Sequence, residues 1–234
     1  MRPRSARRHL LLALSVGLLA TGWAPALSAQ VADPDPLRFA DAFEEFARWD
    51  AKNSVPGDAI LFVGSSSIVR WNTAEAFPGM PVINRGFGGS QASDATHWVK
   101  EAVNRYDPAV VVYYEGDNDT GTGKKAAQIF TDVREFAEAV LAHDPGTQIV
   151  FLSVKPSILR WEQWGEAQAT NDLIRQYTLQ RPNLHYVDVG TPMIGRDGRP
   201  MPELFVSDGL HMTQAGYDIW NRVVGPVLNR LHHR

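Results

Sequence analysis

The 234-residue chain contains no cysteine. Disulfide bonds, thiolate metal sites and a lipid-modified cysteine are therefore excluded. Long apolar runs are also scarce: the one that stands out, residues 10–20, is shorter than the roughly 20 residues of a membrane span. Four arginines precede it and small residues follow it at positions 26–29. This order predicts an export signal over residues 1–29, cleaved to give a periplasmic or secreted protein with no membrane span. An uncleaved N-terminal anchor is the alternative.

Positive charge is in short supply as well. Without residues 1–29 the chain carries 19 Lys and Arg against 26 Asp and Glu, a net charge of −7. This balance argues against nucleic acid or an anionic membrane as a partner. The remaining residues suffice for one domain with a complete core. We expect a linker and an amphipathic helix over residues 30–58, followed by the main domain over residues 59–234.

Apolar runs alternate with helical patterns along that domain. Five runs are typical of buried parallel strands: residues 59–63, 82–84, 110–114, 148–153 and 185–189. Helical spacing of apolar residues marks residues 37–51, 95–103, 126–141, 173–177 and 217–231, with a kink expected at Gly225-Pro226. The alternation predicts an α/β protein with a three-layer, flavodoxin-like fold, in which helices cover both faces of a five-stranded parallel sheet.

Two polar loops follow the first and third predicted strands, at residues 64–67 and 116–119. Ligand sites of open parallel sheets lie beyond the carboxyl ends of the strands, so we expect these loops to be neighbours. A serine at such a turn, Ser66, can present its hydroxyl at the sheet edge. Serines are also common N-caps of helices, so capping is the alternative.

A carboxylate and an imidazole, Asp208 and His211, lie three residues apart before the last helical pattern. Asp208 can orient the imidazole, which can then accept a proton from Ser66, as in a Ser-His-Asp triad. The backbone N–H groups of Ser66 and Gly89 and the side-chain amide of Asn118 are candidate donors to an oxyanion. Ordinary turn formation is the alternative for each segment taken alone.

Sequence motifs for binding nucleotides or metal ions are incomplete in this chain. Residues 86–91 lack the last glycine of a dinucleotide fingerprint, and residues 123–125 lack the flanking residues of a phosphate loop. Residues 117–128 resemble a calcium loop, but Gly121 occupies a ligand position and Gln128 replaces the terminal glutamate. No histidine cluster has the spacing of metal ligands. We expect neither a cofactor nor a metal.

Taken together, four segments resemble the SGNH (GDSL-type) serine hydrolases, over residues 59–220. Gly64-Ser65-Ser66-Ser67 is similar to the first block of that family, residues 84–90 to the second, Gly116-Asp117-Asn118-Asp119 to the third and Asp208-Gly209-Leu210-His211 to the last. The resemblance implies that Ser66 is the nucleophile, that Asp208 and His211 complete the triad, and that Gly89 and Asn118 serve the oxyanion. One departure is Ser65, which stands where the family usually has aspartate.

The family is broad, so the substrate has to be argued from other residues. Trp71, Trp161 and Trp164 follow predicted strands on the side of the site, and aromatic walls suit sugar rings or acyl chains. No long apolar lid is visible. We therefore expect an exported esterase that cleaves short-acyl, acetyl-type esters of a carbohydrate or similar polar molecule. A lysophospholipase or thioesterase of the same family is one alternative, and a catalytically silent glycan-binding domain is another.

Overall fold

A five-stranded parallel sheet with the order β2-β1-β3-β4-β5 forms the centre of the protein. Its strands are β1 (Ile60–Gly64), β2 (Val82–Gly86), β3 (Val110–Tyr114), β4 (Gln148–Leu152) and β5 (Leu184–Val187). The computed structural model describes residues 30–232, so the export signal predicted over residues 1–29 lies outside the described residues. All five predicted strands are present, and their bounds differ from the predicted ones by at most two residues.

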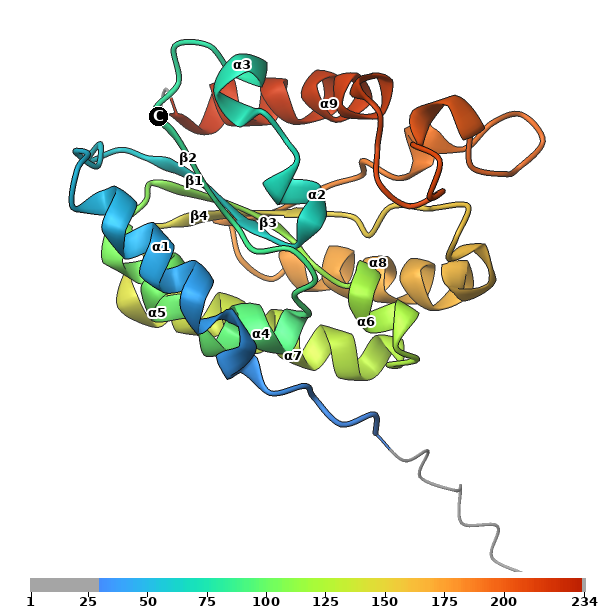
Figure 1. Ribbon diagram of the computed structural model, residues 1–234, viewed down its shortest axis with the longest axis horizontal. Coiled ribbons are helices and arrows are strands. Elements are labelled where there is room, and N and C mark those ends of the chain that lie inside the picture. Colours follow the sequence, from blue (N-terminus) through green and yellow to red (C-terminus); the bar gives the residue numbers. More distant parts are fainter. Residues whose placement is uncertain (1–29, 233–234) are drawn as a thin grey trace, which may run out of the picture.

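Helices cover both faces of the sheet, which confirms the predicted three-layer α/β fold (Figure 1). One face carries α1 (Ala40–Asp50), α4 (Ala92–His97), α5 (Val99–Ala102), α7 (Ala126–His143) and α8 (Trp164–Thr178). The other carries α2 (Ser66–Val69), α3 (Thr73–Ala76) and α9 (Gln214–His232). The remaining elements are α6 (Asp117–Gly121) and the short 3-10 helices η1 (Pro36–Phe39), η2 (Asn104–Tyr106), η3 (Trp161–Gln163), η4 (Thr191–Met193) and η5 (Pro202–Leu204).

The central strands β1 and β3 are buried on both faces. Alternate residues of β1 enter opposite cores: Leu61 and Val63 pack under α4 and α7, whereas Ile60 and Phe62 pack under α9. Burying each such side chain contributes about 1.5–3 kcal/mol relative to leaving it exposed. Because both sides of these strands are buried, their sequences are continuous apolar runs without alternation. These runs are the signal from which the strands were predicted.

One helical prediction needs correction. The helix expected over residues 95–103 is interrupted at Trp98, which leaves helical geometry between α4 and α5. The Trp98 ring stacks on Phe43 of α1 at 4.3 Å, and its Nε1 donates to the Pro36 carbonyl, so tertiary contacts override the local pattern. α9 continues past Pro226, the position at which the sequence predicts a kink. Leu228 and Leu231 beyond the proline remain anchored in the core.

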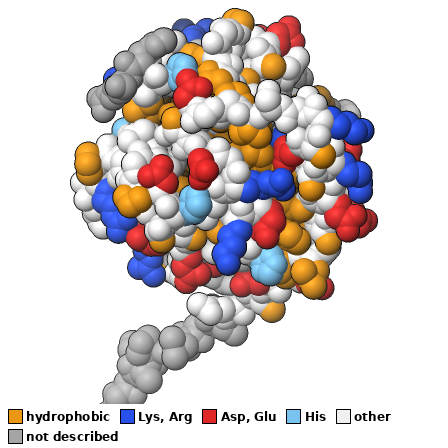
Figure 2. Space-filling view, turned by 90° about the vertical axis from the view of Figure 1, so that its left-hand side faces the viewer, with side chains coloured by type: hydrophobic (Ala, Val, Ile, Leu, Met, Phe, Trp, Pro, Cys, Tyr) orange, Lys and Arg blue, Asp and Glu red, His pale blue; other side chains and the backbone are white. Residues whose placement is uncertain are grey.

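The carboxyl ends of the strands meet toward the right-hand end of Figure 1, where α2, α6 and the segment before α9 lie. β1 and β3 are neighbours, so the predicted adjacency of the loops after them is confirmed. Gly64 ends β1 where a Cβ atom would lie 2.0 Å from the Tyr114 carbonyl oxygen, so only glycine lets the two chains approach this closely. On the opposite face, at the amino ends, acidic, basic and apolar side chains are interspersed (Figure 2).

None of the helices within residues 30–232 combines the length and the apolar character required to cross a membrane.

Candidate active site

Ser66 is the first residue of α2, directly after the turn that ends β1. Its Oγ lies 3.1 Å from Nε2 of His211, across 145 residues of sequence. Ser66 is half-buried, whereas Ser65 and Ser67 are 2% and 3% exposed. Of the three adjacent serines, Ser66 is therefore the one that combines access to solvent with an imidazole partner.

His211 is held by the turn that contains Asp208. Asp208 Oδ2 lies 2.6 Å from His211 Nδ1, while Asp208 Oδ1 accepts hydrogen bonds from the backbone N–H groups of Leu210 and His211 at 2.8 and 2.9 Å. The hydrogen bond with His211 and those two N–H groups lower the pKa of Asp208 below its usual range. The predicted residues thus form a continuous series of hydrogen bonds, Asp208–His211–Ser66, in which a charged carboxylate faces the imidazole.

The three candidate oxyanion donors lie on Ser66 itself, on the loop packed against it, and on a side chain in contact with that loop. Among the described residues, the backbone N–H groups of Ser66 and Gly89 donate no hydrogen bond. The loop that carries Gly89 lies against the serine: a Cβ built on Gly88 would be 3.7 Å from Ser66 Cβ. The Asn118 side chain contacts the same loop, because its Nδ2 donates to the Ser90 carbonyl at 2.8 Å and has a second N–H to offer. The structure therefore brings together every residue predicted for the triad and the oxyanion donors.

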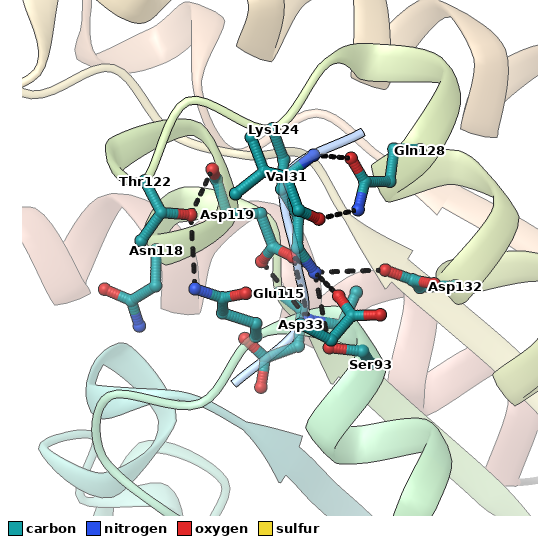
Figure 3. Close-up of polar contacts among 12 residues, drawn as sticks. Val31, Asp33, Ser93, Glu115, Asn118, Asp119, Thr122, Lys124, Gln128 and Asp132 are labelled. Atoms are coloured by element: carbon teal, nitrogen blue, oxygen red, sulfur yellow. Dashed lines mark hydrogen bonds and ion pairs between the residues drawn. The ribbon is translucent and has the colours of Figure 1, made fainter. Parts of the chain in front are cut away.

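Behind these donors lies a buried network of charged side chains (Figure 3). Asn118 and Asp119 are consecutive in α6 but point in different directions, Asp119 turning inward. Asp119 accepts from the Ala92 backbone N–H and forms an ion pair with Lys124, whose side chain is fully buried and also contacts Asp33 and Asp132. Burial raises the pKa of Asp119 to about 6 against the opposing effect of Lys124. This network ties α6 to the loop of residues 89–92.

Glu115, the residue after β3, is a second buried acid behind the site. Ser90 Oγ donates to Glu115 Oε1 at 2.5 Å, and Oε2 has no hydrogen-bond partner among the described residues. Burial, followed by the negative charge of Asp119, raises the pKa of Glu115 well above its ordinary value. The buried site therefore favours the protonated form of Glu115. Glu115 thus anchors Ser90, and the carbonyl of Ser90 in turn accepts from the Asn118 amide.

Of the three tryptophans expected near the substrate, Trp71 has to be reassigned. It is 3% exposed, packs against Phe62 and Trp220 in the core under α9, and donates through Nε1 to Asn221. It is a core residue because the segment after α2 folds back over the sheet.

Trp161 and Trp164 remain partly exposed on the segment that leads into α8. Their rings stack at 6.0 Å, and the Arg199 guanidinium lies 5.2 Å from the Trp161 ring. This segment adjoins the site, because the Leu159 N–H donates to the Gly209 carbonyl beside Asp208. Sequence reasoning did not identify Arg160, which follows Leu159 in this segment and contacts Asn118. Nothing in its spacing singles it out, because the two residues are 42 positions apart.

Within the described part of the chain, no group of three or more His, Asp or Glu side chains is placed to hold a metal ion.

Comparison with known proteins supplies the family. The sequence profile of the GDSL-like lipase/acylhydrolase family matches residues 63–219, which include both ends of the hydrogen-bonded series. The chain belongs to this family. It is accordingly a carboxylic ester hydrolase of the GDSL type. None of the curated proteins matches it.

Solved structures share the fold at low sequence identity. A Streptococcus pneumonia protein, solved as a presumed platelet activating factor, is 22% identical with a TM-score of 0.73, over 82% of this chain and 94% of that one. A GDSL-like lipase from Bacteroides thetaiotaomicron is 23% identical with a TM-score of 0.71, over 80% and 97%. A variant of an acetyl-xylooligosaccharide esterase from Geobacillus Stearmophilus is 17% identical with a TM-score of 0.59, over 75% and 94%.

Proposed function

We propose that this esterase works through an acyl-enzyme formed on Ser66. His211 accepts the Ser66 proton as Oγ attacks the ester carbonyl, and then donates that proton to the leaving alcohol. Asp208 holds the imidazole in the required tautomer and stabilises its cationic form. Water, deprotonated by the same histidine, releases the acid in the second half of the reaction.

The tetrahedral oxyanion is received by the N–H groups of Ser66 and Gly89 and by the Asn118 amide. This assignment is supported by the two unpaired backbone donors and by the contact between Asn118 and the Ser90 carbonyl, which leaves one amide N–H for the substrate. Donors that are fixed before the reaction stabilise the developing charge without reorganisation. No step requires a cofactor.

The observation that carries the proposal is the hydrogen-bonded series from Asp208 through His211 to Ser66. We expect Ser66→Ala to lower kcat by on the order of 10³-fold or more and to abolish labelling by a fluorophosphonate probe, with the circular dichroism spectrum unchanged. Ser65→Ala and Ser67→Ala serve as matched controls. Retained labelling in Ser66→Ala, with loss in either control, would move the nucleophile to the neighbouring serine. A wild-type protein that resists the probe would instead support the silent glycan-binding domain.

For the substrate we propose short-acyl esters of a carbohydrate or similar polar molecule. Two observations support this class: the stacked Trp161 and Trp164 beside the site, and the fold shared with an acetyl-xylooligosaccharide esterase. One observation favours the lysophospholipase or thioesterase alternative. Ile158, Leu159 and Val206 are 46%, 61% and 37% exposed around the Asp208–His211 turn, and such apolar side chains can receive a longer acyl chain.

A series of p-nitrophenyl esters separates the two substrates. We expect higher kcat/KM for acetyl and butyryl esters than for octanoyl and longer ones. If the acyl chain lay on the exposed apolar residues, each buried CH₂ would contribute up to about 0.8 kcal/mol, and kcat/KM would rise steadily to dodecanoyl. Trp161→Ala and Trp164→Ala should reduce kcat/KM on acetylated oligosaccharides more than on p-nitrophenyl acetate. Equal losses on both substrates would remove the tryptophans from sugar binding.

Export completes the proposal. The arginines and the apolar stretch within residues 1–29 support a cleaved signal, which would deliver the esterase to the periplasm or the medium. N-terminal sequencing of the protein recovered from each compartment tests this: a mature chain that begins near residue 30 outside the cytoplasm is expected, and an intact Met1 in the cytoplasmic fraction contradicts it.

A further inference from the structure

Arg160 lies in the loop between β4 and α8, one residue before η3, and its side chain is 20% exposed. Its guanidinium turns toward α6, where Nη2 donates to Asn118 Oδ1 at 2.9 Å and Nη1 donates to Asp117 Oδ1 at 2.6 Å. We propose that Arg160 is a positioning residue that fixes and polarises the Asn118 amide as an oxyanion donor. This inference rests on the oxyanion role proposed for Asn118.

The first consequence of this contact is the orientation of the amide. Asn118 Oδ1 faces the Arg160 guanidinium, and Nδ2 faces the Ser90 carbonyl. Turning the amide over would place N–H groups against a cation and a carbonyl oxygen against another carbonyl. Both hydrogen bonds would be lost and replaced by repulsion. The remaining N–H of Nδ2 is therefore held in one direction before substrate arrives, which is the condition for effective oxyanion stabilisation.

The second consequence is electrostatic. Asp117 is shared by Arg160 and the buried Lys155, whose Nζ lies 2.7 Å from Asp117 Oδ2. Burial alone would raise the pKa of Asp117, but the charges of Lys155 and Arg160 lower it below its ordinary value, so Asp117 is ionised between these two basic side chains. Two cations and one carboxylate leave one positive charge in excess. The excess lies on the carbonyl side of the Asn118 amide, where it draws electrons from the N–H group and strengthens it as a donor to an anion.

The neighbouring acids have partners of their own. Asp119 shares Lys124 with Asp33 and Asp132, and Glu115 accepts from Ser90 Oγ, with a pKa that burial raises.

Gly121, in the last position of α6, provides the space in which the guanidinium lies. A Cβ at this position would come within 2.7 Å of Arg160 Nε and 2.9 Å of Arg160 Cζ, closer than nonbonded atoms approach. Any larger residue would push the guanidinium away from Asn118 while leaving its charge and chemistry intact. Gly121→Ala therefore offers a second way to break the contact, independent of removing the arginine.

The test is a double-mutant cycle on purified enzyme with p-nitrophenyl acetate. We expect Arg160→Gln to lower kcat by roughly tenfold or more, with KM changed less than about twofold, because the lost interaction acts mainly on the transition state. Asn118→Ala should lower kcat by roughly 10²-fold. In the double variant, Arg160→Gln should lower kcat by less than about twofold beyond Asn118→Ala, because a positioning residue has nothing left to position.

Other outcomes separate this inference from the proposed function. Multiplicative losses in the double variant would overturn it, and so would an Arg160→Gln effect confined to KM, which would make the arginine a substrate contact. Unchanged kcat in Asn118→Ala would instead remove the oxyanion role on which the inference rests.

Two further variants control for loss of folding. Arg181, before β5, also makes two hydrogen bonds to a carboxylate, that of Glu138. The control variant Arg181→Gln removes these bonds, and its kcat should match that of the wild type. If Arg160→Gln does not fold, Gly121→Ala takes its place in the cycle. It should lower kcat alone and leave Asn118→Ala unaffected. A normal kcat in folded Gly121→Ala would contradict the positioning role.

Discussion

Glu115 offers a sharp test of the electrostatics behind the site. It is 1% exposed, its Oε2 has no hydrogen-bond partner among the described residues, and burial raises its pKa well above its ordinary value of 4.5. Glu115→Gln preserves the shape and the Oε1 atom that accepts from Ser90, but it cannot ionise. We expect the variant to keep kcat within about twofold of wild type, because the Ser90 carbonyl stays in place for Asn118.

The variant should differ from wild type in how its stability depends on pH. A carboxyl group whose pKa is raised on folding contributes most below its unfolded pKa, and that contribution is lost as the pH rises toward the folded pKa. Because each pKa unit corresponds to about 1.4 kcal/mol, wild type should lose up to about 1.4 kcal/mol of unfolding free energy per pH unit relative to Glu115→Gln. The loss should begin at about pH 4.5.

Urea unfolding of both proteins from about pH 5 to about pH 8 measures this difference. The absolute offset between the two proteins is uninformative, because glutamine buries N–H groups of its own. The slope of the difference is informative, because all other titrating groups cancel. A difference that stays constant over the whole range would refute the reasoning, since it would mean that Glu115 does not change its protonation on folding.

Two further predictions concern other charged groups. Asp208→Asn should lower kcat by roughly 10⁴-fold at neutral pH, as loss of a triad carboxylate does. Because hydrogen bonds lower the pKa of Asp208, its stabilising effect is present above about 3.8 and is lost only as the pH falls through the lowered value. Lys124→Met should reduce the unfolding free energy, measured in urea, by about 3–5 kcal/mol, because Asp119 and Asp132 lose a buried cation. A loss below about 1 kcal/mol would mean that the buried ion pairs are energetically neutral.

The strands and the motif residues were predictable because each carries a local signal. Parallel strands buried on both faces are uninterrupted apolar runs, and residues 110–114 match β3 to the residue. Ser66 and Asn118 follow strands that the alternation of elements places side by side, so the topology alone brought them together.

The features that were missed depend on contacts between distant segments. Trp98 breaks its helix because of a ring contributed by α1, 55 residues earlier in the chain. Trp71 looked like a substrate contact because it follows a strand, but the chain folds it into the core. Arg160 and Lys124 have the composition of surface residues, and only the three-dimensional arrangement supplies the carboxylates that hold them.

The course of α9 has a practical consequence for attaching this enzyme to a solid support. The helix starts beside the site and ends at the opposite side of the sheet, where His232 Nε2 lies 3.9 Å from Asp58 Oδ2, close to the start of β1 (Figure 1). A bead or electrode coupled through the end of α9 would thus face the amino ends of the strands. The candidate active site would point into the medium. It would be accessible even to polymeric substrates that are too large to enter the space between the support and the immobilised enzyme.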